Sequence, residues 1–231
     1  MKIDVLDHGY VQYIHHMGDD KEVINAARAS YNKSIEVMEE RDSRLLAYLF
    51  RQAHGSVLRH CAVTLAVRAP LFVARQLWKY HVATAVTEGQ DGWNESSRRY
   101  VTEEPQFYIP QWRRASVDKK QGSGAPLDDL AYAHALRHRM IESIEDGVIK
   151  YDLAIAGGIA PEQARCFLPA YAMYVSWHWT LSMQSVLHML SERLQHDAQW
   201  ETTEYAKAIH EIVKGIWPET LAAWEANERT H

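Results

Sequence analysis

Cysteine is scarce in this chain of 231 residues, which contains only Cys61 and Cys166. Two cysteines cannot build a disulfide framework, and their separation does not match the ligand spacing of a zinc site. The opening residues, Met1 to Asp4, lack the apolar stretch of a signal peptide. We therefore expect a cytoplasmic protein that depends on neither disulfides nor a bound metal.

An excess of basic charge is also missing, because 25 lysines and arginines stand against 30 aspartates and glutamates, for a net charge of −5. A chain with this slight negative charge does not bind a nucleic-acid polymer through its overall charge. Any anion must therefore bind at a local cluster of basic residues. With 47% apolar residues the chain is long enough to bury a sizeable core. This composition excludes a mainly disordered, collagen-like or coiled-coil protein.

One run without formal charge is long enough to span a bilayer, but it is not uniformly apolar. It extends over 26 residues, from Cys166 to Ser191. Polar residues and one proline interrupt it, at Pro169, Ser176, His178, Thr180, Ser182, Gln184, Ser185, His188 and Ser191. This composition predicts a helix buried in protein, with a polar stripe along a cavity, rather than a helix in lipid. We expect no membrane partner.

Strands and helices are both expected elsewhere in the chain. Aromatic and β-branched residues predict a strand at 9–14 and a half-buried strand at 57–67. Acidic first turns, prolines and glycines predict helices at 20–27, 42–52, 71–80 and 127–156, a helical turn at Pro161, and a helical final third broken at Pro218.

Two polar, glycine-containing segments, 87–92 and 119–128, predict loops, and the second is expected to be the most flexible part of the chain. No repeat or strong domain boundary is visible. We expect a single α+β domain over residues 1–231, with a central β-sheet flanked by long helices.

The segment from Arg75 to Tyr100 has the highest density of basic and hydrogen-bonding side chains. Its positive or potentially positive groups are Arg75, Lys79, His81, Arg98 and Arg99, and Asn94, Glu95, Ser96 and Ser97 accompany them. Arginine supplies planar charge-assisted donors and serine a small hydroxyl, a combination that suits a phosphate or carboxylate ligand. The alternative is a solvated surface turn held by Arg–Glu pairs.

Arg165 and Arg193 stand near the two ends of the uncharged run. A cation at each end of a buried, polar-striped helix fits a pocket for a flat anionic ligand. The alternative for each is helix capping or a structural ion pair, which for Arg193 would involve Glu192, Asp197 or Glu201.

Two segments of the Arg75–Tyr100 region resemble the motif of the flavin-dependent thymidylate synthases. Arg75-Gln76, followed by Asn94-Glu95-Ser96-Ser97-Arg98-Arg99-Tyr100, is similar to that family's R-Q-x-x-R-H-R and N-E-x-S-x-R-Y. Further likenesses follow the family's order along most of the chain, at Leu6 to Val11, Met17 to Asp20, Ala26 to Tyr31, His54 with His60, Ala69 to Gln76, Arg165 with Leu168-Pro169, and Arg193 with Ala198 to Glu201. By this resemblance the chain is identified as a divergent member of the family.

The departures from the family's pattern concentrate on positions that contact flavin in the family. Lys79-Tyr80-His81 replaces Arg-His-Arg, and extra residues precede Asn94, around Gly89 and Gly92. Arg59 stands in place of an acidic residue, while Ser182, Gln184 and His188 stand where the family usually carries Asn, Arg and Asn. An Arg137-His138-Arg139 tripeptide occurs without the motif's context, and we interpret it as unrelated to the site.

The resemblance implies methylation of dUMP at C5 to give dTMP, with methylenetetrahydrofolate as carbon donor and FAD, reduced by NADPH, as hydride source. It also implies a homotetramer, because the family builds each site from several subunits. The implied substrate-binding residues are Gln76, Lys79, Glu95, Ser97, Arg98, Arg99, Arg165 and Arg193, with Arg193 also catalytic. The implied cofactor-binding residues are His54, Ser56, Lys79, Tyr80, His81, Glu95, Ser182 and His188.

Three alternatives stay open at this point. The same fold could act on another pyrimidine deoxynucleotide, by dCMP methylation or hydroxymethyl transfer, as the altered flavin positions and the extra residues suggest. A thiolate at Cys166, beside Arg165, could attack the pyrimidine, although free cysteines are more often buried apolar residues. A non-catalytic nucleotide-binding relative is the third.

Overall fold

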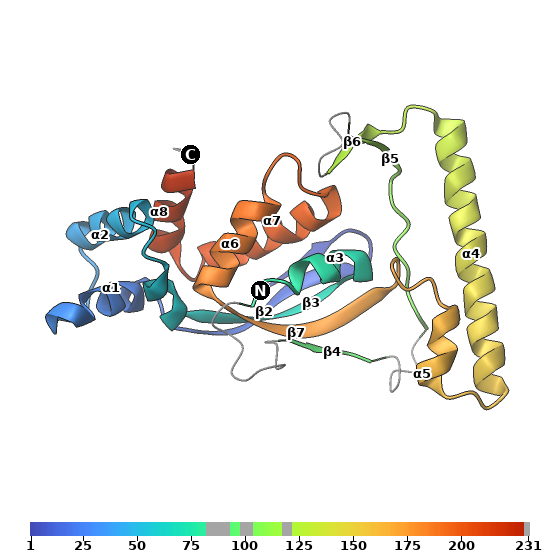
Figure 1. Cartoon of the computed structure of the whole chain (residues 1–231), viewed down its shortest axis with the longest axis horizontal. Helices are drawn as coiled ribbons and strands as arrows, with labels where there is room; N and C mark the ends of the chain where they lie inside the picture. The colour runs from blue at the N-terminus through green and yellow to red at the C-terminus, as the bar shows by residue number, and fades with distance from the viewer. Residues whose placement is uncertain (82–92, 98–103, 117–121, 229–231) are drawn as a thin grey trace.

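The computed structural model describes residues 1–81, 93–97, 104–116 and 122–228 (Figure 1). Two nine-residue strands, β3 (Ala62–Pro70) and β7 (Tyr174–Ser182), form the middle of its main sheet. They pair antiparallel over their whole length, with Ala62 opposite Ser182 and Pro70 opposite Tyr174. Both strands are rich in β-branched or aromatic residues, among them Val63, Val67, Val175, Trp177 and Trp179, the types that a pleated, buried surface favours.

Three more strands complete the main sheet, which has the order β1-β2-β3-β7-β4. β2 (Gly9–Met17) pairs with β3, β1 (Lys2–Val5) pairs with β2, and β4 (Trp93–Glu95) pairs with the other side of β7. A separate two-stranded ribbon is made of β5 (Arg113–Ala115) and β6 (Ser123–Pro126).

The helices fall into three groups around this sheet (Figure 1). One face is covered by α3 (Leu71–Leu77), α6 (Met183–Arg193) and α7 (Trp200–Lys214). One end carries α1 (Asp20–Arg28), α2 (Glu40–Arg51) and α8 (Pro218–Glu228). The opposite end carries α4 (Leu130–Ala156) and the short α5 (Pro161–Ala164), and 3-10 turns occupy Ala29–Tyr31, Gly55–His60 and Arg165–Phe167.

This mixture of helices with an antiparallel central sheet confirms the α+β expectation. No helix in the described part of the chain is both long and apolar enough to cross a membrane. The predicted loop at 87–92 lies outside the described residues, as does part of the segment 119–128, whose remainder includes β6.

The prediction of one buried helix across the uncharged run is wrong. Its middle part forms β7, and the helix α6 begins only at Met183. The polar residues that suggested a helical stripe alternate with apolar ones: Val175, Trp177, Trp179 and Leu181 are buried, whereas Ser176, His178 and Thr180 are less so. A period of two is the pattern of a strand with one face on the core.

The half-buried strand expected at 57–67 is also displaced. Residues 55–60 form a 3-10 turn, and β3 begins at Ala62 and continues to Pro70. Most of β3 is buried rather than half-buried, because it is the central strand and lies between β2 and β7.

Candidate functional site

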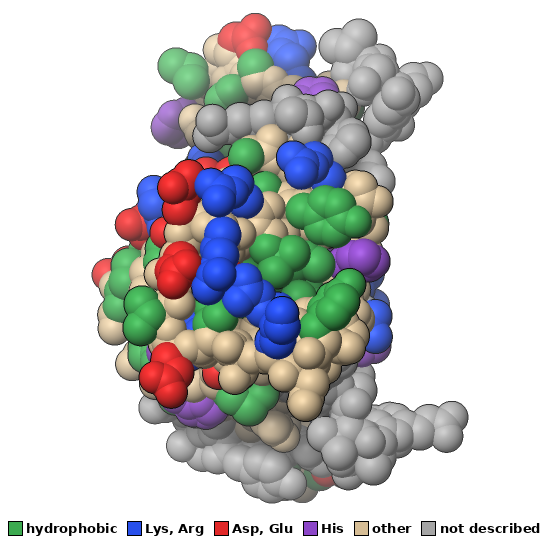
Figure 2. All heavy atoms as spheres, turned by 90° about the vertical axis from the view of Figure 1, so that its left-hand side faces the viewer, with side chains coloured by type: hydrophobic (Ala, Val, Ile, Leu, Met, Phe, Trp, Pro, Cys, Tyr) green, Lys and Arg blue, Asp and Glu red, His purple; other side chains and the backbone are tan. Residues whose placement is uncertain are grey.

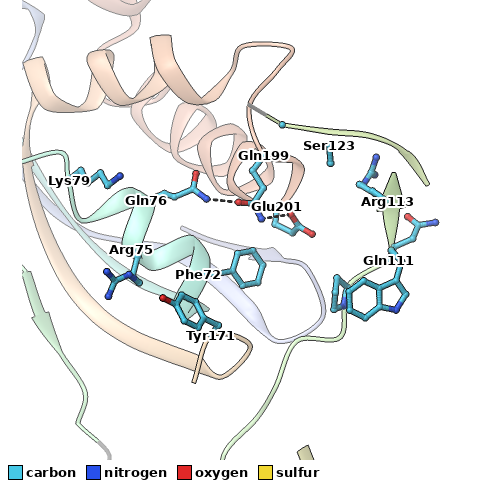
Figure 3. Close-up of a pocket in the computed structure, with 13 residues that line it drawn as sticks. Phe72, Arg75, Gln76, Lys79, Gln111, Arg113, Ser123, Tyr171, Gln199 and Glu201 are labelled. Carbon is cyan, nitrogen blue, oxygen red and sulfur yellow. Dashed lines mark hydrogen bonds between the residues drawn. The ribbon is translucent and has the colours of Figure 1, made fainter. Parts of the chain in front are cut away.

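A large cavity lies between α3, the start of α7 and the β5–β6 ribbon (Figure 3). We call it the Gln76 cavity; it has a volume of about 740 Å³. It takes Arg75, Gln76 and Lys79 from one side of α3 and its end, because residues three and four apart share a helix face. Its other charged and aromatic lining includes Phe72, Trp112, Arg113, Tyr171 and Glu201.

A chain of hydrogen bonds leads away from Gln76 inside this cavity (Figure 3). The Gln76 Nε2 donates to Gln199 Oε1 at 2.5 Å, and the Gln199 Nε2 donates to Glu201 Oε2 at 3.1 Å. Glu201 is buried, and its other oxygen lies 3.5 Å from the hydroxyl of Tyr108. Burial and then the charge of Glu201 raise the pKa of Tyr108, so this phenol stays protonated and acts as a donor.

A second cavity, of about 370 Å³, adjoins the first at Lys79, which lines both. We call it the His188 cavity, and its remaining lining is Tyr80, Ser185, His188 and Glu192. The rings of Tyr80 and His188 meet edge to face with their centroids 5.4 Å apart.

Arg193 stands behind Tyr80, at the end of α6. Its guanidinium lies 5.6 Å from the centre of the Tyr80 ring, and its Nε is buried without a hydrogen-bond partner among the described residues. Burial raises the pKa of Tyr80, while the Arg193 charge and hydrogen bond oppose that shift. Within the described residues Arg193 forms no ion pair with Glu192, Asp197 or Glu201, which contradicts the alternative of a structural ion pair on its own helix.

The remaining described substrate residues gather in a third cavity, of about 380 Å³, which we call the Arg165 cavity. Arg165 comes from the 3-10 turn that follows α5, and Glu95 and Ser97 come from β4 and the residues after it. Desolvation raises the pKa of the Glu95 carboxyl, and the nearby charge of Arg165 opposes that shift. No described residue lines both this cavity and the Gln76 cavity.

The structure therefore divides the predicted substrate residues into two groups. Gln76, Lys79 and Arg193 lie on the α3 and α6 side, while Glu95, Ser97 and Arg165 lie in the Arg165 cavity. Arg98 and Arg99 lie outside the described residues.

The other predicted cofactor residues are more scattered. His54 is exposed at the edge of a small apolar cavity of about 110 Å³ against α2, and Ser56 is exposed beside it in the sequence. His81 is exposed after α3. Ser182 is buried and caps α6, where its hydroxyl accepts the backbone N–H of Ser185 at 3.2 Å. None of these three serine and histidine residues, Ser56, His81 and Ser182, lines the Gln76, His188 or Arg165 cavity.

Residues that depart from the family's pattern contact one another in pairs. Arg59 donates through its Nε to Gln184 Oε1 at 2.6 Å, and Tyr80 packs on His188. Each pair joins a residue from the first half of the chain to one on α6. These four replacements are therefore coupled in space.

Sequence reasoning missed Arg68, which lines the Arg165 cavity from β3. Its Nη2 donates to Gln106 Oε1 at 2.6 Å, and its Nε is buried without a partner in the described part of the chain. It also missed Arg113, brought to the Gln76 cavity by the β5–β6 ribbon. No motif marks either residue, and only their place in the fold reveals them.

A basic cavity far from these residues in sequence lies at the α1–α2 end, which faces the viewer in Figure 2 with blue side chains at its centre. Arg28, Lys33 and Arg41 line it. Arg28 pairs with the buried Asp42, and Arg41 lies 2.9 Å from Glu39, so two of these charges are already compensated. None of the predicted site residues that the structure describes lines it.

Comparison with known proteins identifies the family of the chain. Residues 12–219 match the model of the family described as "Thymidylate synthase complementing protein". The chain belongs to this family. It is 37% identical over 227 residues to the flavin-dependent thymidylate synthase of Thermus thermophilus, covering 97% of this chain and 78% of that protein.

A second curated relative and a solved structure support the same family. The flavin-dependent thymidylate synthase of Thermosipho africanus is 33% identical, over 97% of this chain and 94% of that one. Among solved structures, the UMP/dUMP methylase PolB of Streptomyces cacaoi, bound with 5-Br dUMP, is 25% identical and superposes with a TM-score of 0.79 over 97% of both chains. The protein is thus an enzyme of the flavin-dependent thymidylate synthase type.

Proposed function

We propose that the enzyme catalyses the reductive methylation of dUMP at C5 to dTMP, with methylenetetrahydrofolate as the carbon donor and FAD, reduced by NADPH, as its flavin. The observation that carries this proposal is that Arg165 lines one cavity together with Glu95 and Ser97, two neighbouring motif residues that are far from it in the sequence. A guanidinium and a hydroxyl there can hold the 5′-phosphate through charge-assisted hydrogen bonds.

The residues around the His188 cavity fit a flavin. A flavin combines a flat aromatic ring system, a polar pyrimidine edge and anionic phosphates, and this cavity offers the Tyr80 and His188 rings beside the Lys79 ammonium. The buried, unpartnered Nε of Arg193 adds a donor behind Tyr80 among the described residues. Tyr80, His188 and Lys79 would hold the group, and His81, His54, Ser56, Ser182 and Glu95 remain proposed contacts.

When bound, the reduced flavin would supply the hydride, so the chain itself binds, orients and polarises the nucleotide. In this division Arg165 and Ser97, with Arg99, hold the phosphate, and Lys79 and Arg98 add positive charge from the same motif. Arg193 lies against the pyrimidine and stabilises negative charge that develops on its carbonyl side. Gln76 completes the pocket wall with its amide.

We further propose that the working enzyme is a homotetramer, whose sites combine groups from different subunits. In the part of a single chain that the structure describes, Gln76, Lys79 and Arg193 share no cavity with Glu95, Ser97 and Arg165. The long helix α4 also supports this proposal, since only Gly147 and Tyr151 of its 27 residues are buried. Its exposed apolar side chains include Leu130, Tyr132, Ile149 and Leu153, which a second copy would cover.

Release of tritium from 5-tritiated dUMP tests the proposed reaction directly. We expect the purified protein to be yellow, to bind FAD in a calorimetric titration despite the Lys79-Tyr80-His81 replacement, and to release tritium only when the folate and NADPH are both present. Absence of FAD binding at high micromolar concentration would favour the non-catalytic alternative. Tritium release from 5-tritiated dCMP, but not from 5-tritiated dUMP, would favour the alternative substrate.

Alanine in place of Cys166 should leave turnover close to wild type, because the proposed route needs no enzyme nucleophile. The variant is informative because the exposed Cys166 lines the Arg165 cavity, where a thiolate route would place it. Cys61→Ala is the matched control: Cys61 is buried, and desolvation with neighbouring acidic residues raises the pKa of its thiol to about 12, so it stays protonated. Loss of tritium release in folded, nucleotide-binding Cys166→Ala would establish the cysteine route instead.

A further inference from the structure

The hydrogen bonds between Gln76, Gln199 and Glu201 have a direction that the chemistry of their ends fixes. A carboxylate only accepts, whereas a glutamine amide both donates and accepts. Glu201 lies in the first turn of α7, where the helix dipole favours a negative charge. One of its oxygens faces the Tyr108 hydroxyl and the other faces Gln199, so Gln199 must turn its Nε2 toward Glu201.

That orientation passes to Gln76. With its Nε2 on Glu201, Gln199 presents its Oε1 to Gln76, which therefore has to donate through its own Nε2. Figure 3 shows the Gln76 nitrogen facing Gln199 and its oxygen pointing away. Among the described residues this oxygen has no hydrogen-bond partner.

We propose that Glu201, acting through Gln199, is a positioning residue that fixes the Gln76 amide so that its Oε1 accepts a hydrogen bond from an N–H or O–H donor of the bound nucleotide. This inference rests on the proposed function, because it takes a pyrimidine deoxynucleotide as the ligand. Such a ligand offers two donors of this kind, the N3–H of uracil and the 3′-hydroxyl of deoxyribose. Cytosine carries an unprotonated N3, which would face the Gln76 oxygen as a second acceptor.

If the Gln76 amide is free to rotate, the enzyme should no longer prefer nucleotides that carry the donor bound by its Oε1. In Glu201→Gln the new amide can accept or donate, and in Gln199→Met the link to Gln76 is removed, so in both variants the Gln76 amide can rotate. The ligands are dUMP, dCMP, which changes the base, and 2′,3′-dideoxyuridylate, which lacks the sugar hydroxyl. Dissociation constants are measured by calorimetry on flavin-loaded enzyme, with thermal unfolding to verify folding.

We expect wild type to bind dUMP more tightly than one of the two analogues by about tenfold or more, as for a buried group left without its partner. The affected analogue is the one that lacks the donor that Gln76 binds. In both variants the ratio of its dissociation constant to that of dUMP should fall toward one. Glu204→Gln is the matched control, because Glu204 is one turn further along α7 and pairs with Lys207 at the surface. It should keep the wild-type ratio.

Unchanged ratios in both variants would overturn the inference and leave the proposed function standing. An equal weakening for all three ligands would also overturn it, since that result shows a merely structural role for Glu201. Failure of wild type to bind dUMP at all would instead overturn the proposed function, together with the inference that rests on it.

Discussion

Alanine at Arg193 is expected to lower turnover by about 10²–10³ while the protein keeps its flavin content and its native mass. Chemistry at C5 and C6 pushes electron density toward the pyrimidine carbonyl, so negative charge develops there in the transition state. A cation in a water-poor pocket stabilises that charge more than it stabilises the neutral base, and only this difference accelerates the reaction. Arg193 has the required setting, with a buried Nε that has no partner in the described part of the chain and a guanidinium next to Tyr80.

The measurement is single-turnover tritium release, with flavin absorbance and native mass measured on the same sample. Arg193→Lys should restore only part of the rate, because lysine keeps the charge but cannot present two parallel donors. Arg44→Ala is the control, since Arg44 is an exposed residue paired with Glu40 on α2 and should not affect turnover. An Arg193→Ala variant with near-normal turnover and a lowered melting temperature would show that this arginine acts only in packing.

Alanine at Arg165 is expected to weaken nucleotide binding by about 1.5–3 kcal/mol, the usual range for a hydrogen bond to a charged group. The Nε of Arg165 donates to the carbonyl of Glu162 at 3.2 Å, which anchors the guanidinium and leaves its terminal amino groups for a ligand. Glu95 and Ser97 lie in the same cavity. The same loss is predicted for Arg99→Ala from the motif alone.

The comparison that decides this prediction is dUMP against deoxyuridine, measured by calorimetry. If Arg165 holds the phosphate, the Arg165→Ala variant should lose affinity for the nucleotide. It should lose much less affinity for the nucleoside, which carries no phosphate. Arg44→Ala again serves as the control and should bind both as wild type does. Equal losses for nucleotide and nucleoside would show that Arg165 supports the cavity wall and does not hold the phosphate.

The amino-acid sequence by itself was enough to determine the family, the α+β class and the approximate position of most helices. The motif Asn94 to Tyr100, with Arg75-Gln76 before it, is local, and so are the signals for α1, α2, α3 and α4. A helix start is marked by its own capping and dipole residues, so a reader of the sequence can place it without the rest of the fold.

The uncharged run shows where local signals failed. Its nine interruptions predict a helical stripe, whereas in the structure Ser176, His178 and Thr180 alternate with buried residues in β7. Composition describes how polar a segment is, whereas the choice between strand and helix depends here on pairing with β3, over 100 residues earlier in the chain. Such long-range pairing overrides a weak local preference.

Only the tertiary structure decided which residues meet. It pairs Arg59 with Gln184 and Tyr80 with His188, so positions that depart from the family one by one in the sequence are joined in space. It also connects Gln76 to Glu201 through Gln199, although more than 120 residues separate Gln76 from Gln199. A hydrogen bond and its direction depend on distances of about 3 Å, and only the packing of α3 against α7 brings these groups within that reach.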